Sequence, residues 1–93
     1  MKIEYDTGKR LQTLQDRGLD FEDAVIVFHS ARCITWVDTR HDYGEKRVIT
    51  MGLLNERHVI VVHTDRGTRI RIISMRKANE REILWFEKQF EEG

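Results

Sequence analysis

The 93-residue sequence contains no proline and only one cysteine, Cys33. A single thiol cannot form an internal disulfide, and it excludes a zinc site built on several cysteine ligands. No stretch approaches the roughly 18 apolar residues that a membrane-spanning helix needs, and the opening residues have no apolar core of the signal-peptide kind. We therefore expect one domain, residues 1–93, that folds in the reducing cytoplasm without contact with a membrane.

The sequence also lacks a net charge, because 16 Lys and Arg balance 16 Asp and Glu. The charges are unevenly distributed: residues 46–81 carry nine Lys and Arg against three Asp and Glu, a net charge of +6. Acidic residues exceed basic ones on both sides of this segment. A basic middle with acidic flanks favours a local anion-binding site over a uniformly basic surface. The alternative is a set of solvated strand faces with no ligand.

Several motifs that would define an enzyme class are absent. The sequence has no phosphate-binding glycine loop, no His-Glu-x-x-His motif and no nucleophile elbow. Its four histidines lack the close spacing of a metal site. Cys33 lies in a β-branched segment and is most simply a small buried side chain. We therefore expect neither a bound metal nor a cofactor.

The N-terminal third predicts a short strand over residues 3–5 and two short helices. Polar residues that favour N-caps precede residues 8–16, and Gly18 suits the left-handed position that ends a helix. Asp20 would cap the second helix. This second helix carries one apolar stripe at helical spacing, made of Phe21, Ala24, Val25 and Phe28.

The middle of the chain changes to the pattern of strands. Four β-rich segments follow one another, over residues 33–38, 47–53, 58–64 and 68–75. The Val-rich third segment is typical of a central strand that is buried on both faces, and Gly52 indicates a bulge in the second segment. In the last segment Ile70 and Ile72 share one face, whereas Arg69 and Arg71 share the other. Short loops between successive strands imply antiparallel pairing.

The C-terminal segment predicts a helix that begins at Asn79. Asn79 and Glu82 have the spacing of a capping box. Ile83, Phe86 and Phe90 form the stripe that would pack on the sheet. Helices at the two chain ends and a four- to five-stranded antiparallel sheet between them predict the α+β class, with two N-terminal helices and one C-terminal helix.

Two segments combine side chains that are able to carry chemistry. Residues 41–47 place His41, Glu45 and Arg47 around a glycine just before a strand, and loops that enter a sheet are frequent places for functional groups. The alternative is that Glu45 and Arg47 form an ordinary exposed ion pair.

The second segment, residues 69–81, runs from a strand directly into a helix. Cations near a helix N-terminus oppose the helix dipole, so Arg76 and Arg81 are easier to understand if an anion binds there. The planar fork of arginine suits phosphate oxygens. The alternative is a surface ion pair between Arg76 and Glu80, four residues on.

With these segments in place, nearly the whole chain resembles the BrnT toxins of bacterial type II toxin–antitoxin operons, which belong to the RelE-like ribonuclease superfamily. The most specific stretch is Ile70-Arg71-Ile72-Ile73-Ser74-Met75-Arg76-Lys77-Ala78, followed by Glu80-Arg81. Other matching marks are Ile3-Glu4-Tyr5-Asp6, Arg17-Gly18, Phe21-Glu22-Asp23-Ala24, Val27-Phe28, Asp38, Arg40-His41, Gly44-Glu45, Arg47 and Gly52.

The resemblance implies a RelE-like fold and an endoribonuclease toxin that cleaves mRNA and inhibits translation. It also implies a BrnA-like antitoxin partner, a ribbon-helix-helix protein, with operator DNA bound only indirectly through that partner. RNA can be cleaved without a metal because its own 2′-OH attacks the neighbouring phosphorus. The alternatives are a non-catalytic module that binds RNA or a protein, and a regulatory subunit that acts only as co-repressor with its partner.

Under the ribonuclease hypothesis the candidate residues take three roles. Arg76, Arg71 and Arg47 would stabilise charge on the phosphoryl oxygens. His41 and Glu45 are the candidates for proton transfer, since the unperturbed pKa of histidine, about 6.5, suits neutral pH. The side chains expected to contact the RNA backbone are Lys9, Lys77, Arg69 and Arg81.

Overall fold

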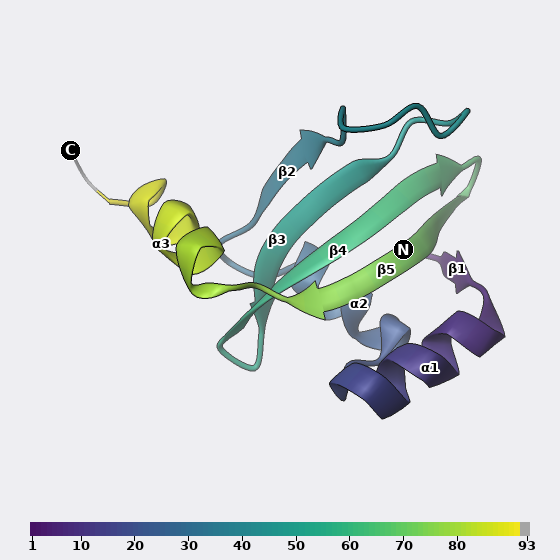
Figure 1. Cartoon of the computed structure of the whole chain (residues 1–93), viewed down its shortest axis with the longest axis horizontal. Coiled ribbons are helices and arrows are strands. Elements are labelled where there is room, and N and C mark those ends of the chain that lie inside the picture. The colour runs from purple at the N-terminus through teal and green to yellow at the C-terminus, as the bar shows by residue number, and fades with distance from the viewer. Residues whose placement is uncertain (92–93) are drawn as a thin grey trace.

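The computed structural model describes residues 1–91 as one five-stranded sheet with helices at both chain ends (Figure 1). In chain order the elements are β1 (Ile3–Tyr5), α1 (Thr7–Arg17), the 3₁₀ turn η1 (Phe21–Asp23), α2 (Ala24–Phe28), β2 (Ile34–Val37), β3 (Val48–Leu54), β4 (Arg57–Arg66), β5 (Arg69–Lys77) and α3 (Glu80–Lys88). The predicted α+β class is confirmed. No helix among the described residues is long and apolar enough to cross a membrane.

The strand order across the sheet is β1-β5-β4-β3-β2, so the Val-rich strand β4 is central, as predicted. The three pairs β2–β3, β3–β4 and β4–β5 are antiparallel, but β1 runs parallel to β5. The prediction of antiparallel pairing is therefore right for the four successive strands and does not extend to the β1 edge. A long connection through α1 and α2 separates β1 from the other strands, so no hairpin fixes its direction.

The caps of the N-terminal helices confirm the sequence prediction. The Asp6 side chain accepts a hydrogen bond from the Lys9 amide, and Gly18 ends α1 at a φ of 67°. Asp20 caps the second helical segment, but the first turn of that segment is the 3₁₀ turn η1. Because a 3₁₀ turn has three residues rather than 3.6, the buried face shifts. Phe21 and Ala24 of the predicted stripe are fully buried, but Val25 and Phe28 are only partly buried, and Val27, outside the stripe, is fully buried in their place.

Gly52 does not mark a bulge. A Cβ atom at this position would lie 2.7 Å from the Val27 carbonyl oxygen and 2.6 Å from Ser30 Oγ. Both residues belong to the end of α2 and the turn after it. Glycine is present because the backbone of α2 approaches β3 closely there.

The bulge lies instead between β4 and β5. Val62 is paired with Ser74, whereas the next residue, His63, is paired with Ile72, so Ile73 has no partner on β4. The alternation of side chains therefore shifts by one position along β5. Ile72 and Met75 both enter the core, and the shift places Arg71 and Arg76 together on the opposite face of the sheet.

Each face of the sheet has its own apolar cluster. The helices α1, η1 and α2 cover one face, where Phe21, Val27, Val61 and Met75 are among the buried side chains. On the other face Phe86 of α3 packs with Ile49, Met51 and Ile60. Figure 1 shows α3 set apart from α1, at the opposite end of the sheet.

The predicted stripe of the last helix is confirmed in part. Phe86 is fully buried and Ile83 is partly buried, but Phe90 is 38% exposed. Phe90 follows the last turn of α3 and lies beside the Phe86 ring, with the two ring centroids 4.9 Å apart. The predicted capping box between Asn79 and Glu82 is present. The short α3 therefore covers one end of its sheet face and leaves an open hollow beside it.

Candidate functional site

A hollow of about 290 Å³ opens on the face of the sheet that carries α3, at the junction of β5 and α3. Its floor is apolar and consists of Ile49, Ile60 and Val62. Its walls carry four charged side chains, Asp38, Arg40, Arg76 and Glu82, and the remaining lining residues are Trp36, Val37, Thr39 and Ser74. We term this site the charged hollow.

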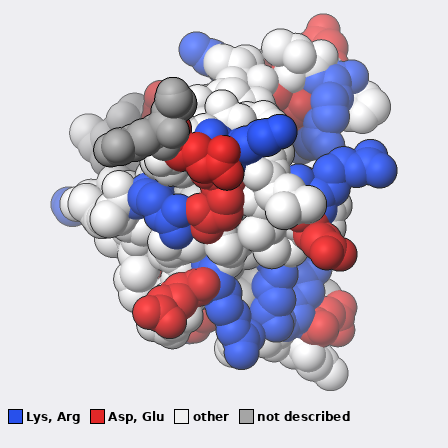
Figure 2. Space-filling model, turned by 90° about the vertical axis from the view of Figure 1, so that its left-hand side faces the viewer, with Lys and Arg blue, Asp and Glu red and all other residues white. Residues whose placement is uncertain are grey.

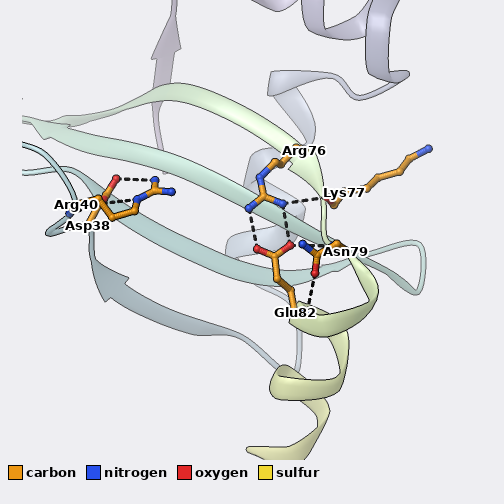
Figure 3. Close-up of polar contacts among 6 residues, drawn as sticks. All are labelled: Asp38, Arg40, Arg76, Lys77, Asn79 and Glu82. Atoms are coloured by element: carbon orange, nitrogen blue, oxygen red, sulfur yellow. Dashed lines mark hydrogen bonds and ion pairs between the residues drawn. The ribbon is translucent and has the colours of Figure 1, made fainter.

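Arg76 enters the charged hollow from β5 and binds Glu82 of α3 (Figure 3). Its Nη1 and Nη2 atoms each donate to one carboxylate oxygen of Glu82, both at 2.8 Å. These hydrogen bonds raise the pKa of Arg76 and lower the pKa of Glu82. Glu82 also accepts a hydrogen bond from the Asn79 amide in the capping box, so its carboxylate is fixed from two sides.

Asp38 and Arg40 form a second ion pair, at the end of β2. The Asp38 side chain is 1% exposed. It accepts hydrogen bonds from Arg40 Nε at 2.9 Å, Nη2 at 3.0 Å and the backbone amide at 3.1 Å. The side-chain hydrogen bonds from Arg40 are the main reason why the pKa of Asp38 falls to about 2. Asp38 is therefore ionised at any physiological pH.

The charges of the hollow cancel in pairs. Figure 3 shows the Asp38–Arg40 pair and the Arg76–Glu82 pair apart from each other, with neither arginine bound to the carboxylate of the other pair. The outer surface at the α3 end likewise carries acidic and basic side chains side by side (Figure 2). Two guanidinium groups above an apolar floor suit phosphate oxygens, but both forks already bind a carboxylate. An anion that binds here in the same way must displace one of these carboxylates.

Of the predicted site residues, only Arg76 lines the charged hollow. Arg71 lies further along the same face of β5 and binds Glu4 of the neighbouring β1, with Nη1 2.9 Å from Oε2. These two arginines share a face because of the bulge opposite β4, but the structure does not bring them to one ligand-sized space.

The segment 41–47 forms a cluster of its own. The Arg47 guanidinium lies 3.7 Å from the centroid of the Tyr43 ring, and its Nε is 3.8 Å from Glu45. Glu45 also binds Arg66 at 3.1 Å. The exposed His41 packs on the Tyr43 ring at 5.6 Å between centroids. The alternative reading of this segment, an ion pair of Glu45 and Arg47, is thus present, but both side chains are partly buried and not fully exposed.

The predicted RNA-binding residues are spread over the surface. Lys9 lines a separate shallow hollow between α1 and β5, together with Arg17 and Ser74. Arg69 and Lys77 are exposed at the two ends of β5. Arg81 is exposed in the first turn of α3, next to a groove that adjoins the charged hollow.

Sequence reasoning missed Asp38, Arg40 and Glu82 as members of the site. The alternative that it considered for Arg76 was an ion pair with Glu80, four residues on, as in helical spacing. Arg76 is still in the strand, so helical spacing does not apply across the junction, and its partner is Glu82. The available signal was the capping-box carboxylate itself, which points back toward the end of β5.

Residues 1–91 contain no group of three or more His, Cys, Asp or Glu side chains arranged to hold a metal ion. A comparison with curated proteins gives no match to the chain. A comparison with protein families matches residues 5–82 to the family described as ribonuclease toxin, BrnT, of type II toxin-antitoxin system. Since this match covers most of the 93 residues, including both ion pairs of the charged hollow, the chain belongs to the BrnT family of ribonuclease toxins.

Proposed function

We propose that the chain is a metal-independent endoribonuclease of the cytoplasm that cleaves mRNA, inhibits translation and is neutralised by a BrnA-like antitoxin. The observation that carries the proposal is the placement of Arg76. Its guanidinium lines a ligand-sized hollow with an apolar floor, at the junction of β5 and α3. Membership of a ribonuclease family makes an RNA phosphate the anion that this fork would bind.

The proposed reaction uses the RNA 2′-OH as the nucleophile. Its oxygen attacks the adjacent phosphorus, the bond to the 5′-oxygen breaks, and a 2′,3′-cyclic phosphate and a 5′-hydroxyl result. The protein has to accept the proton of the 2′-OH, protonate the leaving oxygen and stabilise negative charge on the phosphoryl oxygens. Arg76 has the third role, after the phosphate has replaced Glu82 in its fork.

His41 and Glu45 remain our candidates for proton transfer. Both belong to the loop that leaves the wall of the charged hollow at Asp38, and the His41 ring is exposed. Arg47 holds this loop through Tyr43 and Glu45, so its proposed contact with the phosphoryl oxygens requires that it leave these partners.

The surface cations would guide the RNA strand toward the hollow. Lys77 lies one residue from Arg76, and Arg81 lies in the first turn of α3. Arg69 lies at the far end of β5, and Lys9 lies on α1, beside β5. Arg71 would add a phosphate contact once it is released from Glu4. The BrnA-like antitoxin would inhibit the enzyme by covering part of this surface.

The test is cleavage of a defined mRNA by the purified chain in the presence of a chelator. We expect fragments that end in a 2′,3′-cyclic phosphate and begin with a 5′-hydroxyl. Binding of the RNA without cleavage would support the non-catalytic binding module instead. For the partner, we expect a BrnA-like protein to co-elute with the chain and to block cleavage, and separate elution at micromolar concentration would contradict this part of the proposal.

A further inference from the structure

An apolar groove of about 470 Å³ adjoins the charged hollow and shares three lining residues with it: Trp36, Ile60 and Glu82. Its other lining residues are Met51, Arg81 and Trp85. We term it the tryptophan groove. Its volume lies within the range of about 300–1,000 Å³ that is common for ligand sites. A ligand that fills one of the two spaces therefore reaches directly into the other.

The two tryptophans of the sequence meet in this groove. Their rings are nearly perpendicular, at 73°, with centroids 5.5 Å apart. Trp85 is 44% exposed, which is unusual for the largest apolar side chain. Single-stranded nucleic acids commonly bind proteins by stacking unpaired bases on exposed aromatic rings of this kind.

Arg81 differs from the arginines of the charged hollow. Arg40 and Arg76 each bind a carboxylate, but no carboxylate lies within 4.0 Å of the Arg81 guanidinium among residues 1–91. Its charge is therefore available to a ligand. A cation beside an aromatic groove matches one nucleotide, with a base for the rings and a phosphate for the guanidinium.

We propose that the tryptophan groove binds an unpaired base of the RNA substrate, next to the phosphate that is cleaved at Arg76. The base stacks on Trp85, its phosphate binds Arg81, and the adjoining phosphate enters the charged hollow. This inference rests on the proposed ribonuclease function.

An apolar helix of a protein partner is the other occupant to consider. Such a helix would also use Leu84, which is 66% exposed and lines, together with Trp85, a further hollow along α3 away from the charged hollow. It would leave unused the charge of Arg81, which has no carboxylate partner among residues 1–91. The groove is continuous with the charged hollow, so its aromatic surface lies next to the guanidinium groups of Arg40 and Arg76. This continuity favours RNA, which offers a base to the aromatic surface and phosphates to the guanidinium groups.

Tryptophan fluorescence reports directly on the groove, since both tryptophans line it. The probe is a single-stranded oligonucleotide with 2′-deoxy sugars, which binds but cannot be cleaved through a 2′-OH. We expect quenching in wild type and in Trp36→Phe, and much weaker quenching in Trp85→Phe. Binding of the probe without any change in fluorescence would overturn the proposal.

A pair of variants on α3 measures the contribution of stacking. Trp85→Ala should raise the Kd for the probe about 5- to 150-fold, because base–aromatic stacking contributes about 1–3 kcal/mol and 1.4 kcal/mol is tenfold in Kd. Leu84→Ala, at the next position, should leave the Kd within about twofold. Thermal unfolding checks that both variants fold.

A probe with one abasic position needs no variant. The abasic position replaces the base that is expected to stack on Trp85. The Kd of wild type for this probe should rise by about the same factor as the Kd of Trp85→Ala for the intact probe. If Trp85→Ala binds and cleaves RNA like wild type but loses the BrnA-like antitoxin, the groove is a protein site and the base proposal is wrong. If wild type cleaves no RNA at all, the proposed function fails before this question arises.

Discussion

The guanidinium of Arg76 and the carboxylate of Glu82 face each other across the junction of β5 and α3, with two hydrogen bonds of 2.8 Å. This geometry is the one that arginine adopts toward a phosphate group. In the proposed reaction the carboxylate occupies the position that the RNA phosphate would take. Glu82 and the substrate would then compete for the Arg76 guanidinium, which allows the role of each residue to be tested separately.

Arg76 should matter more to activity than to folding. Arg76→Ala should lower the rate of RNA cleavage about 10²- to 10³-fold, the usual cost of removing one group that stabilises developing charge. Arg76→Lys should recover only part of this loss, because lysine lacks the planar fork. The measurements are RNA cleavage by purified protein and growth arrest in cells.

The same variants need a control for stability. The Arg76 side chain is 42% exposed, and exposed ion pairs contribute only about 0.2–1 kcal/mol. Thermal unfolding of Arg76→Ala should therefore shift little. A folded Arg76→Ala protein that still cleaves RNA near the wild-type rate would remove Arg76 from the site and leave Arg71 and Arg47 as the candidates.

Glu82→Gln should tighten RNA binding. Glutamine keeps the capping-box acceptor for the Asn79 amide, so the change removes charge without removing the cap. When Glu82 no longer holds the Arg76 guanidinium, Arg76 is available to bind one more phosphate of the RNA. The slope of the logarithm of the binding constant against the logarithm of the salt concentration should therefore become steeper by about 0.7, the value per phosphate contact on a single-stranded nucleic acid. The measurement is the Kd for a non-cleavable RNA analogue over a range of salt concentrations.

Glu80→Gln is the matched control for this variant, because Glu80 is exposed in the same helical turn. It should change the affinity only slightly and leave the slope unaltered. Weaker RNA binding by Glu82→Gln would mean that Glu82 orients Arg76 for the substrate instead of competing with it.

Asp38 should contribute to stability in a pH-dependent way. Hydrogen bonds from Arg40 lower the pKa of Asp38 from 3.8 to about 2 in the folded chain. A carboxyl group whose folded pKa is depressed stabilises the protein above its unfolded pKa and loses this effect as the pH falls through the folded value. Asp38→Asn should therefore lower the melting temperature at pH 7, and the difference from wild type should shrink between about pH 4 and pH 2.

Asp16→Asn provides the comparison for this titration, since Asp16 is exposed on α1 and accepts one hydrogen bond from Gln12. Its melting temperature at pH 7 should stay close to that of wild type, because the side chain is exposed and holds no ion pair among the described residues. A difference between Asp38→Asn and wild type that stays constant down to pH 2 would show that the Arg40 pair does not act through the ionised carboxylate.

The sequence predicted the features that depend on neighbours along the chain. The capping box of Asn79, the left-handed Gly18 and the central position of the Val-rich strand each follow from a few adjacent residues. The bulge opposite β4 was not predictable, because it arises from the register between two strands. The alternation of the sequence alone would have placed Arg71 and Arg76 on opposite faces.

The composition of the charged hollow also depends on contacts between distant segments. Asp38 and Arg40 come from the end of β2, and Glu82 comes from α3. The basic middle of the sequence favoured a local anion-binding site. In the fold, acidic residues outside that segment neutralise much of it, through the pairs Glu4–Arg71, Glu45–Arg66 and Glu82–Arg76.

Gly52→Ala should destabilise the protein by moving α2 away from the sheet. The new Cβ would lie 2.7 Å from the Val27 carbonyl oxygen, a backbone atom that cannot turn aside as a flexible side chain can. Overpacking of this kind typically costs about 1–3 kcal/mol.

Gly18→Ala is the contrasting control. A Cβ atom at Gly18 would lie within 4 Å of no atom of the described residues. Only the left-handed φ of 67° therefore opposes the substitution, at a cost of roughly 1–2 kcal/mol. Chemical unfolding should show a larger loss of unfolding free energy for Gly52→Ala than for Gly18→Ala. Adding Ser30→Ala to Gly52→Ala should recover only part of this loss, because the Val27 carbonyl remains in place. A Gly52→Ala protein as stable as wild type would mean that α2 does not hold its close approach to β3.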